Sequence, residues 1–364
     1  MDKDNYCVIM AGGVGSRFWP MSRAKRPKQF LDILGTGHTL LEITFDRLRK
    51  IVPTENILIV TNRDYGTLVS EQLPDLPQEN ILLEPSRRNT APCIAYASFK
   101  IKERNPEARM IVAPSDHLIL KEDKFLKVVQ DGLKFVTDEK ALLTIGIPPS
   151  RPETGYGYIQ ANGPSKSPRT RANLRKVKTF TEKPDLKLAK IFYESGEFFW
   201  NSGIFIWSVS TILDSFNRHQ PEIHSVFTEG EGKYNTGEEE SFIDYAYAEC
   251  KNISIDYGIM EKAENVFVIT SDFGWSDLGT WGSLHDHLKK DRKKNVVVGK
   301  DILTYDVQGC LVNVPEDKLV VLQGLENLII VETNDVLLVC RMEDEQKIRN
   351  IVNDVRIQQG DKYI

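Results

Sequence analysis

The first 150 residues alternate between short apolar runs and longer amphipathic stretches, and this alternation restricts the fold more than any other feature of the sequence. The apolar runs predict strands at 6–11, 56–61, 80–83, 109–113 and 141–146. The stretches between them predict helices at 39–52, 63–73, 90–104 and 122–137. The runs are rich in Val, Ile and Leu on both alternations, which indicates a mostly parallel sheet covered by helices on both sides. Because such sheets bind ligands beyond the C-terminal ends of their strands, the functional residues are expected in the loops that follow the strands.

The middle of the chain is more mixed. Strand-like runs such as WNSGIFIW and NVFVIT alternate with further predicted helices at 185–195, 209–218 and 279–289. Acidic residues crowd the stretch 229–240, which predicts a solvated loop.

The pattern changes after the charged run 289–294, which is interpreted as a linker between domains rather than as a basic patch for a polyanion. Short β-rich runs then recur about every 8 or 9 residues up to residue 340, which predicts a few turns of a β-helix or a small barrel. A helix at 343–357 is expected to close the chain. We therefore expect an α/β domain over 1–288 and a β-rich domain with a terminal helix over 289–364.

The composition excludes several classes of function. The 47 basic and 52 acidic residues give a net charge of −5, which argues against a general binder of nucleic acid or membrane surfaces. No apolar run approaches the ~18 residues of a membrane span, and the N-terminus does not resemble a signal peptide. The five cysteines are scattered without a CxxC pair, which is typical of free thiols in a reducing compartment. A cytoplasmic protein is therefore expected.

The segment AGGVGSRFWPMSRAKRPKQF (11–30) is the strongest functional signal. Its three glycines (Gly12, Gly13 and Gly15) allow the backbone to approach an anion closely. Between Val14 and Leu31 there are five basic residues and no acidic ones, which favours a polyphosphate site. The Rossmann fingerprint fails because Phe18 stands where its third glycine belongs, and the Walker loop fails because Gln29 follows the lysine. Hydride transfer on a nicotinamide and P-loop hydrolysis are thus disfavoured.

Two aspartates in other loops are candidate ligands of a metal ion. Asp116, in APSDH, follows the predicted strand 109–113, and Asp277, in GWSDLG, lies in a turn flanked by glycines. Two carboxylates together with phosphate oxygens and water make the usual magnesium site. Taken singly, Asp116 could almost equally be a helix cap, and Asp277 could almost equally be an ordinary turn residue.

These motifs, with EPSRRNTAP (84–92), TGYGYI (154–159), FTEKP (180–184) and WNSGIFIW (200–207), resemble in their order the sugar-1-phosphate nucleotidylyltransferases, and most closely the mannose-1-phosphate guanylyltransferases. The resemblance covers nearly the whole chain. It implies a Rossmann-like nucleotidyltransferase domain followed by a small β-helix-like domain. It also implies transfer of GMP from GTP to mannose 1-phosphate, giving GDP-mannose and pyrophosphate, with Mg²⁺ as cofactor and a homodimer as the assembly.

The resemblance also assigns roles to residues of this chain. Those expected to act in catalysis are Arg17, Lys28 and Lys183. Those expected to bind the nucleotide are Ala11, Gly12, Gly13, Gly15, Ser16, Arg17, Lys28, Glu84, Pro85, Arg88, Asn89 and Asp116. Those expected to bind the sugar phosphate are Gly155, Tyr156, Gly157, Glu182, Lys183, Asn201 and Asp277. Asp116 and Asp277 are expected to hold the Mg²⁺.

The expected reaction needs no general base, because the sugar phosphate is already dianionic near neutrality and attacks the α-phosphorus of GTP itself. This suits a sequence without a convincing Ser/His/Asp or Cys/His constellation. Two alternatives stay open at this point. One is a guanylyltransferase for another sugar 1-phosphate (heptose, glucose or fucose), and the other is a non-catalytic regulatory homologue that binds sugar nucleotides.

Overall fold

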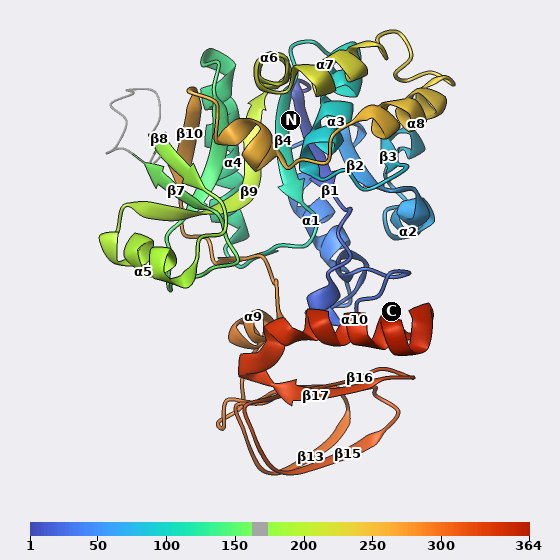
Figure 1. Ribbon diagram of the computed structural model, residues 1–364, viewed down its shortest axis with the longest axis vertical. Helices are drawn as coiled ribbons and strands as arrows, with labels where there is room; N and C mark the ends of the chain where they lie inside the picture. Colours follow the sequence, from blue (N-terminus) through green and yellow to red (C-terminus); the bar gives the residue numbers. More distant parts are fainter. Residues whose placement is uncertain (162–173) are drawn as a thin grey trace. The chain divides into compact units, whose positions relative to one another are not determined.

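A computed structural model of the chain describes residues 1–161 and 174–364 (Figure 1). These residues form two compact units whose segments interleave along the chain. Unit 1 contains residues 1–12, 44–115 and 119–275, and unit 2 contains residues 13–43, 116–118 and 276–364. The glycine-rich segment 13–43 thus packs with the C-terminal part of the chain. The domain boundary placed after residue 288 stays a prediction.

Unit 1 is built on a nine-stranded sheet in the order β3-β2-β1-β4-β9-β6-β10-β8-β7. Its strands are β1 (Asn5–Met10), β2 (Ile57–Asn62), β3 (Ile81–Glu84), β4 (Arg109–Pro114), β6 (Leu142–Ile147), β7 (Tyr158–Ala161), β8 (Leu174–Thr181), β9 (Phe198–Ser208) and β10 (Val266–Thr270). The first four strands pair in parallel, as does β6 with β10, while β9, β8 and β7 join the sheet antiparallel to their neighbours. The expected α/β class is confirmed, and the second half of the sheet is mixed.

Helices pack against this sheet because their apolar faces match its buried strands. The 3₁₀ turns η3, η4 and η5 span Thr54–Asn56, Arg63–Tyr65 and Gln78–Asn80. The helices are α1 (Leu40–Leu48, which begins in unit 2), α2 (Gly66–Gln72), α3 (Thr90–Arg104), α4 (Glu122–Asp138), α5 (Leu186–Ser195), α6 (Val209–His219), α7 (Pro221–Thr228) and α8 (Glu239–Glu249), followed by the π-turn η6 (Asp256–Met260). A continuous core joins β1, β2 and β4 to α3 and α6. In the part of the chain that the structure describes, no helix is both long and apolar enough to cross a membrane.

Unit 2 contains the β-rich C-terminal part. Its strands are β12 (Val296–Val298), β13 (Asp301–Gln308), β14 (Leu311–Asn313), β15 (Leu319–Glu326), β16 (Leu328–Glu332) and β17 (Leu337–Arg341). Parallel strands alternate between two sheets, β12-β14-β16 and β13-β15, around a small core that includes Val307, Val312 and Ile330. This alternation is the geometry of a β-helix, which decides between the two predicted forms. The other elements of unit 2 are η1 (Ser16–Phe18), η2 (Lys28–Phe30), α9 (Trp281–His287), η7 (Met342–Lys347), α10 (Ile348–Gln359) and η8 (Gly360–Tyr363). Two short strands, β5 (Leu118–Ile119) and β11 (Trp275–Ser276), lie where the chain passes from one unit to the other.

The structure departs from the sequence predictions mainly between β9 and β10. Helices α7 and α8 were not predicted, and the stretch 229–240 is not wholly a solvated loop, because α8 begins at Glu239 and that carboxylate is buried against Lys100 of α3. An acidic run can enter a core when one of its members finds a buried cation, and the sequence pattern alone does not reveal that partner.

Candidate active site

The segments that follow β1, β3 and β4 meet at one edge of the sheet in unit 1. The backbone N–H of Ser115 donates to Met10 O at 3.0 Å, so the loops after β1 and β4 start side by side. A Cβ on Gly12 would lie 3.4 Å from Glu84 Oε2, so the glycine allows the loop to pass close to that carboxylate. The expectation that the motifs converge at the C-terminal ends of the parallel strands therefore holds for these residues.

Glu84 is buried at this edge, with 6% of its surface exposed. The hydroxyl of Tyr247 donates to Glu84 Oε1 at 2.9 Å. Burial raises the pKa of Glu84 to about 7, although the hydrogen bond from Tyr247 and the nearby Arg87 act to lower it. Glu84 therefore changes charge close to neutral pH.

We expect Glu84→Gln to stabilise the protein increasingly as the pH rises. Between the ordinary value of 4.5 and about 7 the folded state holds this proton more tightly than the unfolded state, so the wild type loses stability through that window. The gain in the free energy of unfolding of Glu84→Gln over the wild type should approach about 3 kcal/mol above pH 7 and vanish below pH 4.5. Each unit of pKa shift is worth about 1.4 kcal/mol. Urea denaturation at pH 5 and pH 8 measures it. The exposed Glu55→Gln is the control, and an equal gain for Glu84→Gln at both pH values would contradict the prediction.

The neighbouring Arg88 contacts α8, and Asn89 makes the contact of a helix start. Arg88 Nε donates to the carbonyl of Tyr247 at 2.9 Å, and the side chain of Asn89, whose φ is 67°, accepts from the N–H of Thr90 at 2.9 Å. Asn89 is therefore the N-cap of α3. Their assignment to the nucleotide, like that of Pro85, stays a prediction.

In unit 2, the glycine-rich loop packs directly on Lys28. Gly15 has a φ of 66°, and a Cβ there would lie 2.6 Å from Lys28 Cβ, so no other residue fits without displacing the lysine. The side chain of Gln29 also donates to Gly13 O at 3.0 Å, which fixes the loop to η2. The glycines thus hold the loop against the basic segment that follows it.

Arg17, in η1, places a guanidinium group in unit 2. Its buried Nε has no hydrogen-bond partner among the residues that the structure describes. Arg349, on α10, lies close enough that burial and the Arg17 guanidinium together lower its pKa. Two neighbouring guanidiniums and a buried N–H without an acceptor favour an anion at this place.

Lys28 is only 3% exposed, and its ammonium contacts three oxygen acceptors. Nζ lies 2.8 Å from Asp116 Oδ2 and donates to the carbonyls of Asp277 and Leu278 at 2.9 Å each. A contact with phosphate therefore requires Lys28 to exchange one of these partners. Burial acts to raise the pKa of Asp116, but Lys28 and then His117 outweigh it, so the pKa lies below its usual value and Asp116 is an anion at neutral pH.

Asp277 lies in a tight turn beside the same ammonium. Its Oδ1 accepts from the N–H of Gly279 at 2.9 Å, and a Cβ on Gly279 would lie 2.6 Å from Asp277 Oδ2. Both proposed metal ligands therefore belong to unit 2 and surround Lys28, Asp116 through its carboxylate and Asp277 through its carbonyl. Among the described residues no group of three or more His, Cys, Asp or Glu side chains could hold a metal ion by itself.

Six of the seven residues assigned to the sugar phosphate lie in unit 1, near the ends of β7, β8 and β9, whereas Asp277 lies in unit 2. Asn201 N donates to Gly157 O at 2.8 Å, and a Cβ on Gly157 would collide with Glu182 Oε2 and lie 3.4 Å from Asn201 Cβ. Lys183 has a φ of 47° and 61% of its side chain is exposed, so the strand ends irregularly there, as FTEKP predicts. Tyr156 packs edge-on against Trp200 and Trp275, with ring centroids 5.1 and 5.2 Å away.

Sequence reasoning missed Asp256, which begins the π-turn η6 and accepts from Asn201 Nδ2 at 2.9 Å. A single carboxylate inside the apolar run ISIDYGIM was the only available signal. Burial and the nearby Glu182 raise the pKa of Asp256 to about 6.

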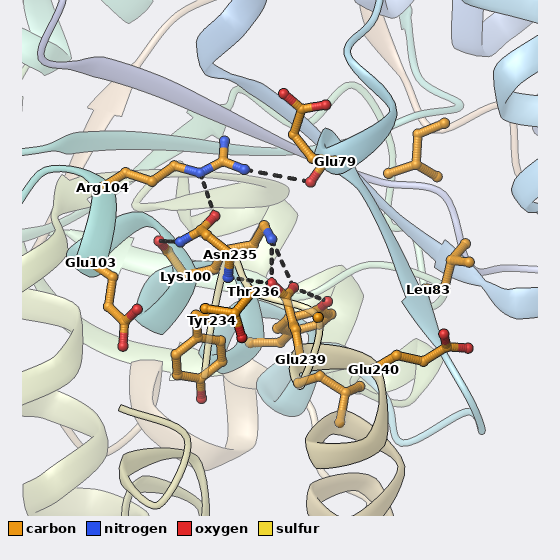
Figure 2. A pocket seen from close by; sticks show the side chains of 14 residues that line it. Glu79, Leu83, Lys100, Glu103, Arg104, Tyr234, Asn235, Thr236, Glu239 and Glu240 are labelled. Carbon is orange, nitrogen blue, oxygen red and sulfur yellow. Dashed lines mark hydrogen bonds and ion pairs between the residues drawn. The ribbon is translucent and has the colours of Figure 1, made fainter. Parts of the chain in front are cut away.

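A cavity of about 790 Å³ in unit 1 is lined by none of the predicted site residues. Figure 2 shows polar contacts along its wall: the Lys100 ammonium contacts the Glu239 carboxylate, and Arg104 Nε donates to the amide oxygen of Asn235. The hydroxyl of Tyr96 also donates to Glu239 Oε1 at 2.6 Å. Because these polar groups contact one another, we interpret this part of the cavity wall as a structural network.

Comparisons with known proteins show the family to which the chain belongs. Residues 6–294 match the nucleotidyl transferase family, which covers more than half of the sequence, so the chain belongs to that family. Residues 300–355 match the MannoseP isomerase/GMP-like beta-helix domain.

Relatives with specific names cover most of the chain. A mannose-1-phosphate guanylyltransferase of Escherichia coli is 38% identical over 352 residues, which are 95% of this chain and 74% of that protein. The alginate biosynthesis protein AlgA of Pseudomonas aeruginosa is 37% identical over 96% of this chain and 72% of that protein. A solved structure described as mannose-1-phosphate geranyltransferase from Thermus thermophilus is 32% identical, with a TM-score of 0.85 over 97% of this chain and 99% of that chain.

Proposed function

We propose that this protein transfers GMP from GTP to mannose 1-phosphate and releases pyrophosphate. The observation that carries the proposal is the 38% identity to a mannose-1-phosphate guanylyltransferase over 95% of this chain. The residues support it independently. Unit 2 presents the Lys28–Asp116 pair and Arg17, whose buried Nε has no hydrogen-bond partner among the described residues, and unit 1 presents the cluster of Gly157, Glu182 and Asn201.

In this mechanism the protein positions two anions and neutralises their charge. The dianionic phosphate of the sugar is the nucleophile, and pyrophosphate leaves from the α-phosphorus in line with it. Arg17 and Lys28 hold the triphosphate and stabilise the leaving pyrophosphate. Lys183 has an exposed side chain and a positive φ, and it offsets the charge on the attacking phosphate. Glu182 and Asn201 hold the hydroxyl groups of the sugar.

The residues around Lys28 fit Mg²⁺ as the cofactor. Asp116 and Asp277 provide hard carboxylate oxygens, and Asp116 already binds a cation in this structure, the Lys28 ammonium. Mg²⁺ is usually bound by one or two carboxylates plus substrate phosphates and water, which matches a donor set that does not complete a site by itself. When bound, the ion would polarise the α-phosphate.

We expect Mg²⁺ to bind only together with the nucleotide. Chelation with EDTA should abolish turnover, yet Mg²⁺ alone should leave the melting temperature of the apo protein unchanged, because two carboxylates hold the ion weakly. GTP with Mg²⁺ should raise the melting temperature by several degrees more than GTP with EDTA. Thermal denaturation under the four conditions measures this, with Asp277→Asn as the variant that should lose the extra shift. A clear shift with Mg²⁺ alone would contradict the prediction.

We further propose a cytoplasmic homodimer. The five cysteines are free thiols, as expected in a reducing compartment. The β-helix exposes Leu303 and Tyr305 on β13 and Leu319 and Val321 on β15, and Leu303 pairs in register with Val321. Contiguous exposed apolar side chains of this kind favour contact with a second copy. Sedimentation equilibrium tests the assembly, and a monomer at micromolar concentration would refute it.

Pyrophosphate release tests the reaction itself. With Mg²⁺ present, GTP, ATP, UTP, CTP and dTTP are each combined with the 1-phosphates of mannose, glucose, fucose and heptose. Release confined to GTP with mannose 1-phosphate is the expected result. Release with another pair would correct the specificity, and no release from a folded protein that binds GTP would support a non-catalytic regulatory homologue.

A further inference from the structure

The strongest feature that the assigned roles leave unexplained is the contact of Asp256 with Asn201. The inference drawn from it rests on the proposed function. Asn201 lies on β9 and Asp256 begins the π-turn η6, 55 residues later. A π-helical backbone is rare, and as a single-turn bulge it is found frequently at functional sites.

This contact leaves Asn201 one orientation of its amide. Asn201 Oδ1 accepts from the backbone N–H of Gly203 and from the hydroxyl of Thr144, both at 3.2 Å. Asn201 Nδ2 donates to Asp256 Oδ1 at 2.9 Å. Oxygen therefore faces donors and nitrogen faces a carboxylate, while the second N–H of the amide is not used by these contacts.

Asp256 is itself held in place by contacts of the preceding segment with α3. The N–H of Ile255 donates to Thr90 Oγ1 at 2.9 Å, and the N–H of Ala91 donates to the carbonyl of Ile253 at 3.1 Å. Gln220 Nε2 holds the turn from the other side by donating to Gly258 O at 3.0 Å. A carboxylate anchored on both sides can orient another residue with little loss of entropy.

We propose that Asp256 is a positioning residue of the sugar-phosphate site, which fixes the Asn201 amide so that its second N–H is presented to a sugar hydroxyl. Three observations place that amide in the cluster assigned to the sugar. Asn201 N donates to Gly157 O, a Cβ on Gly157 would meet the Glu182 carboxylate and Asn201 Cβ, and Glu182 is close enough to Asp256 to raise its pKa. Two charged groups from β8 and its end act on Asp256: Glu182 raises its pKa and Lys183 lowers it. Glu261, which follows η6, interacts with the same Glu182.

Steady-state kinetics of the full chain test the proposal. Asp256→Ala should raise the KM for the sugar phosphate by about 10- to 100-fold, the usual effect of losing a hydrogen bond to a charged group, and should change the KM for GTP by less than about twofold. Asp256→Asn keeps an acceptor for Asn201 and should recover most of the loss. Tyr257→Phe changes an exposed side chain on the same turn and is the matched control.

Two further readouts separate positioning from a general structural role. In a double-variant cycle, Asp256→Ala should add little to Asn201→Ala, because Asp256 acts through that amide. The ratio of the sugar-phosphate KM of Asp256→Asn to that of the wild type should be near one at pH 5. At pH values above 6 the ratio should increase, because the Asp256 carboxyl of the wild type is then ionised and the asparagine is not. Taking this ratio cancels the titration of the sugar phosphate itself.

The outcomes distinguish this inference from the proposed function. A wild type that turns over the substrates, with an unchanged sugar-phosphate KM in Asp256→Ala, overturns the inference alone. Additive effects in the cycle, or equal increases of both KM values, also overturn it. If the wild type turns over none of the sugar 1-phosphates of the panel, and calorimetry shows that it binds none of them, both the inference and the proposed function are overturned.

Discussion

Replacing Lys28 by methionine should lower kcat by about 10²- to 10³-fold, the effect expected when one preorganised charge that stabilises the transition state is lost. Methionine fills nearly the same volume, so Gly15 and the loop against which Lys28 packs keep their contacts. The variant removes the ammonium charge. Asp116 Oδ2 and the carbonyls of Asp277 and Leu278 thereby lose the donor that they share. Single-turnover and steady-state pyrophosphate release measure the effect.

Stability has to be measured with the same variant, because Lys28 is buried. Loss of one partner of a buried ion pair destabilises proteins by about 3–5 kcal/mol, although here Asp116 is partly exposed and can be solvated. The measurements therefore include the urea midpoint, and kcat is compared where each protein is fully folded. Lys25→Met removes an exposed charge from the same segment and is the control. A folded Lys28→Met protein with turnover within about threefold of the wild type would show that Lys28 only anchors the Asp116 and Asp277 loops.

The sequence predicted the elements of this fold where burial and periodicity agree. Strands β1, β2, β3, β4 and β6 read as apolar on both faces, and each lies within two residues of its expected bounds. Periodicity could not predict α8, since its charged first turn has the sequence of a solvated loop. The structure shows instead that Glu239 pairs with Lys100. The chain distance between these residues is 139, and no local pattern carries such a pairing.

The candidate site shows the same limit. The glycines and basic residues of the segment 11–30 predict an anion site, because such a site can be built from backbone and charge that lie close together in the sequence. The partners of each group were hidden from the sequence: the ammonium of Lys28 contacts residues about 250 positions away, and Asn201 contacts Asp256. Residue types therefore predict the chemistry, while the geometry decides which atoms are free for a substrate.

Lys100→Met should lower the free energy of unfolding by about 3–5 kcal/mol, the usual cost of leaving one partner of a buried ion pair alone. Lys100 is 3% exposed, and its ammonium contacts both carboxylate oxygens of Glu239, at 2.8 and 2.5 Å. Burial lowers the pKa of Lys100 even though Glu239 acts to raise it, so the environment is costly for an unpaired charge. In the variant, Glu239 keeps Tyr96 and the N–H of Asn235 as donors but has no cation.

Lys102→Met provides the matched control on the same helix, because Lys102 pairs with Glu231 at 2.7 Å while both side chains are about half exposed. Its loss should cost less than about 1 kcal/mol, since water screens such pairs. Adding Glu239→Gln to Lys100→Met should recover more than half of the lost stability, because the glutamine still accepts from Tyr96 and carries no charge. Urea denaturation measures all four proteins. If Lys100→Met costs no more than Lys102→Met, the pair does not hold α8 to α3, and the cavity beside it would have to be considered as a ligand site instead.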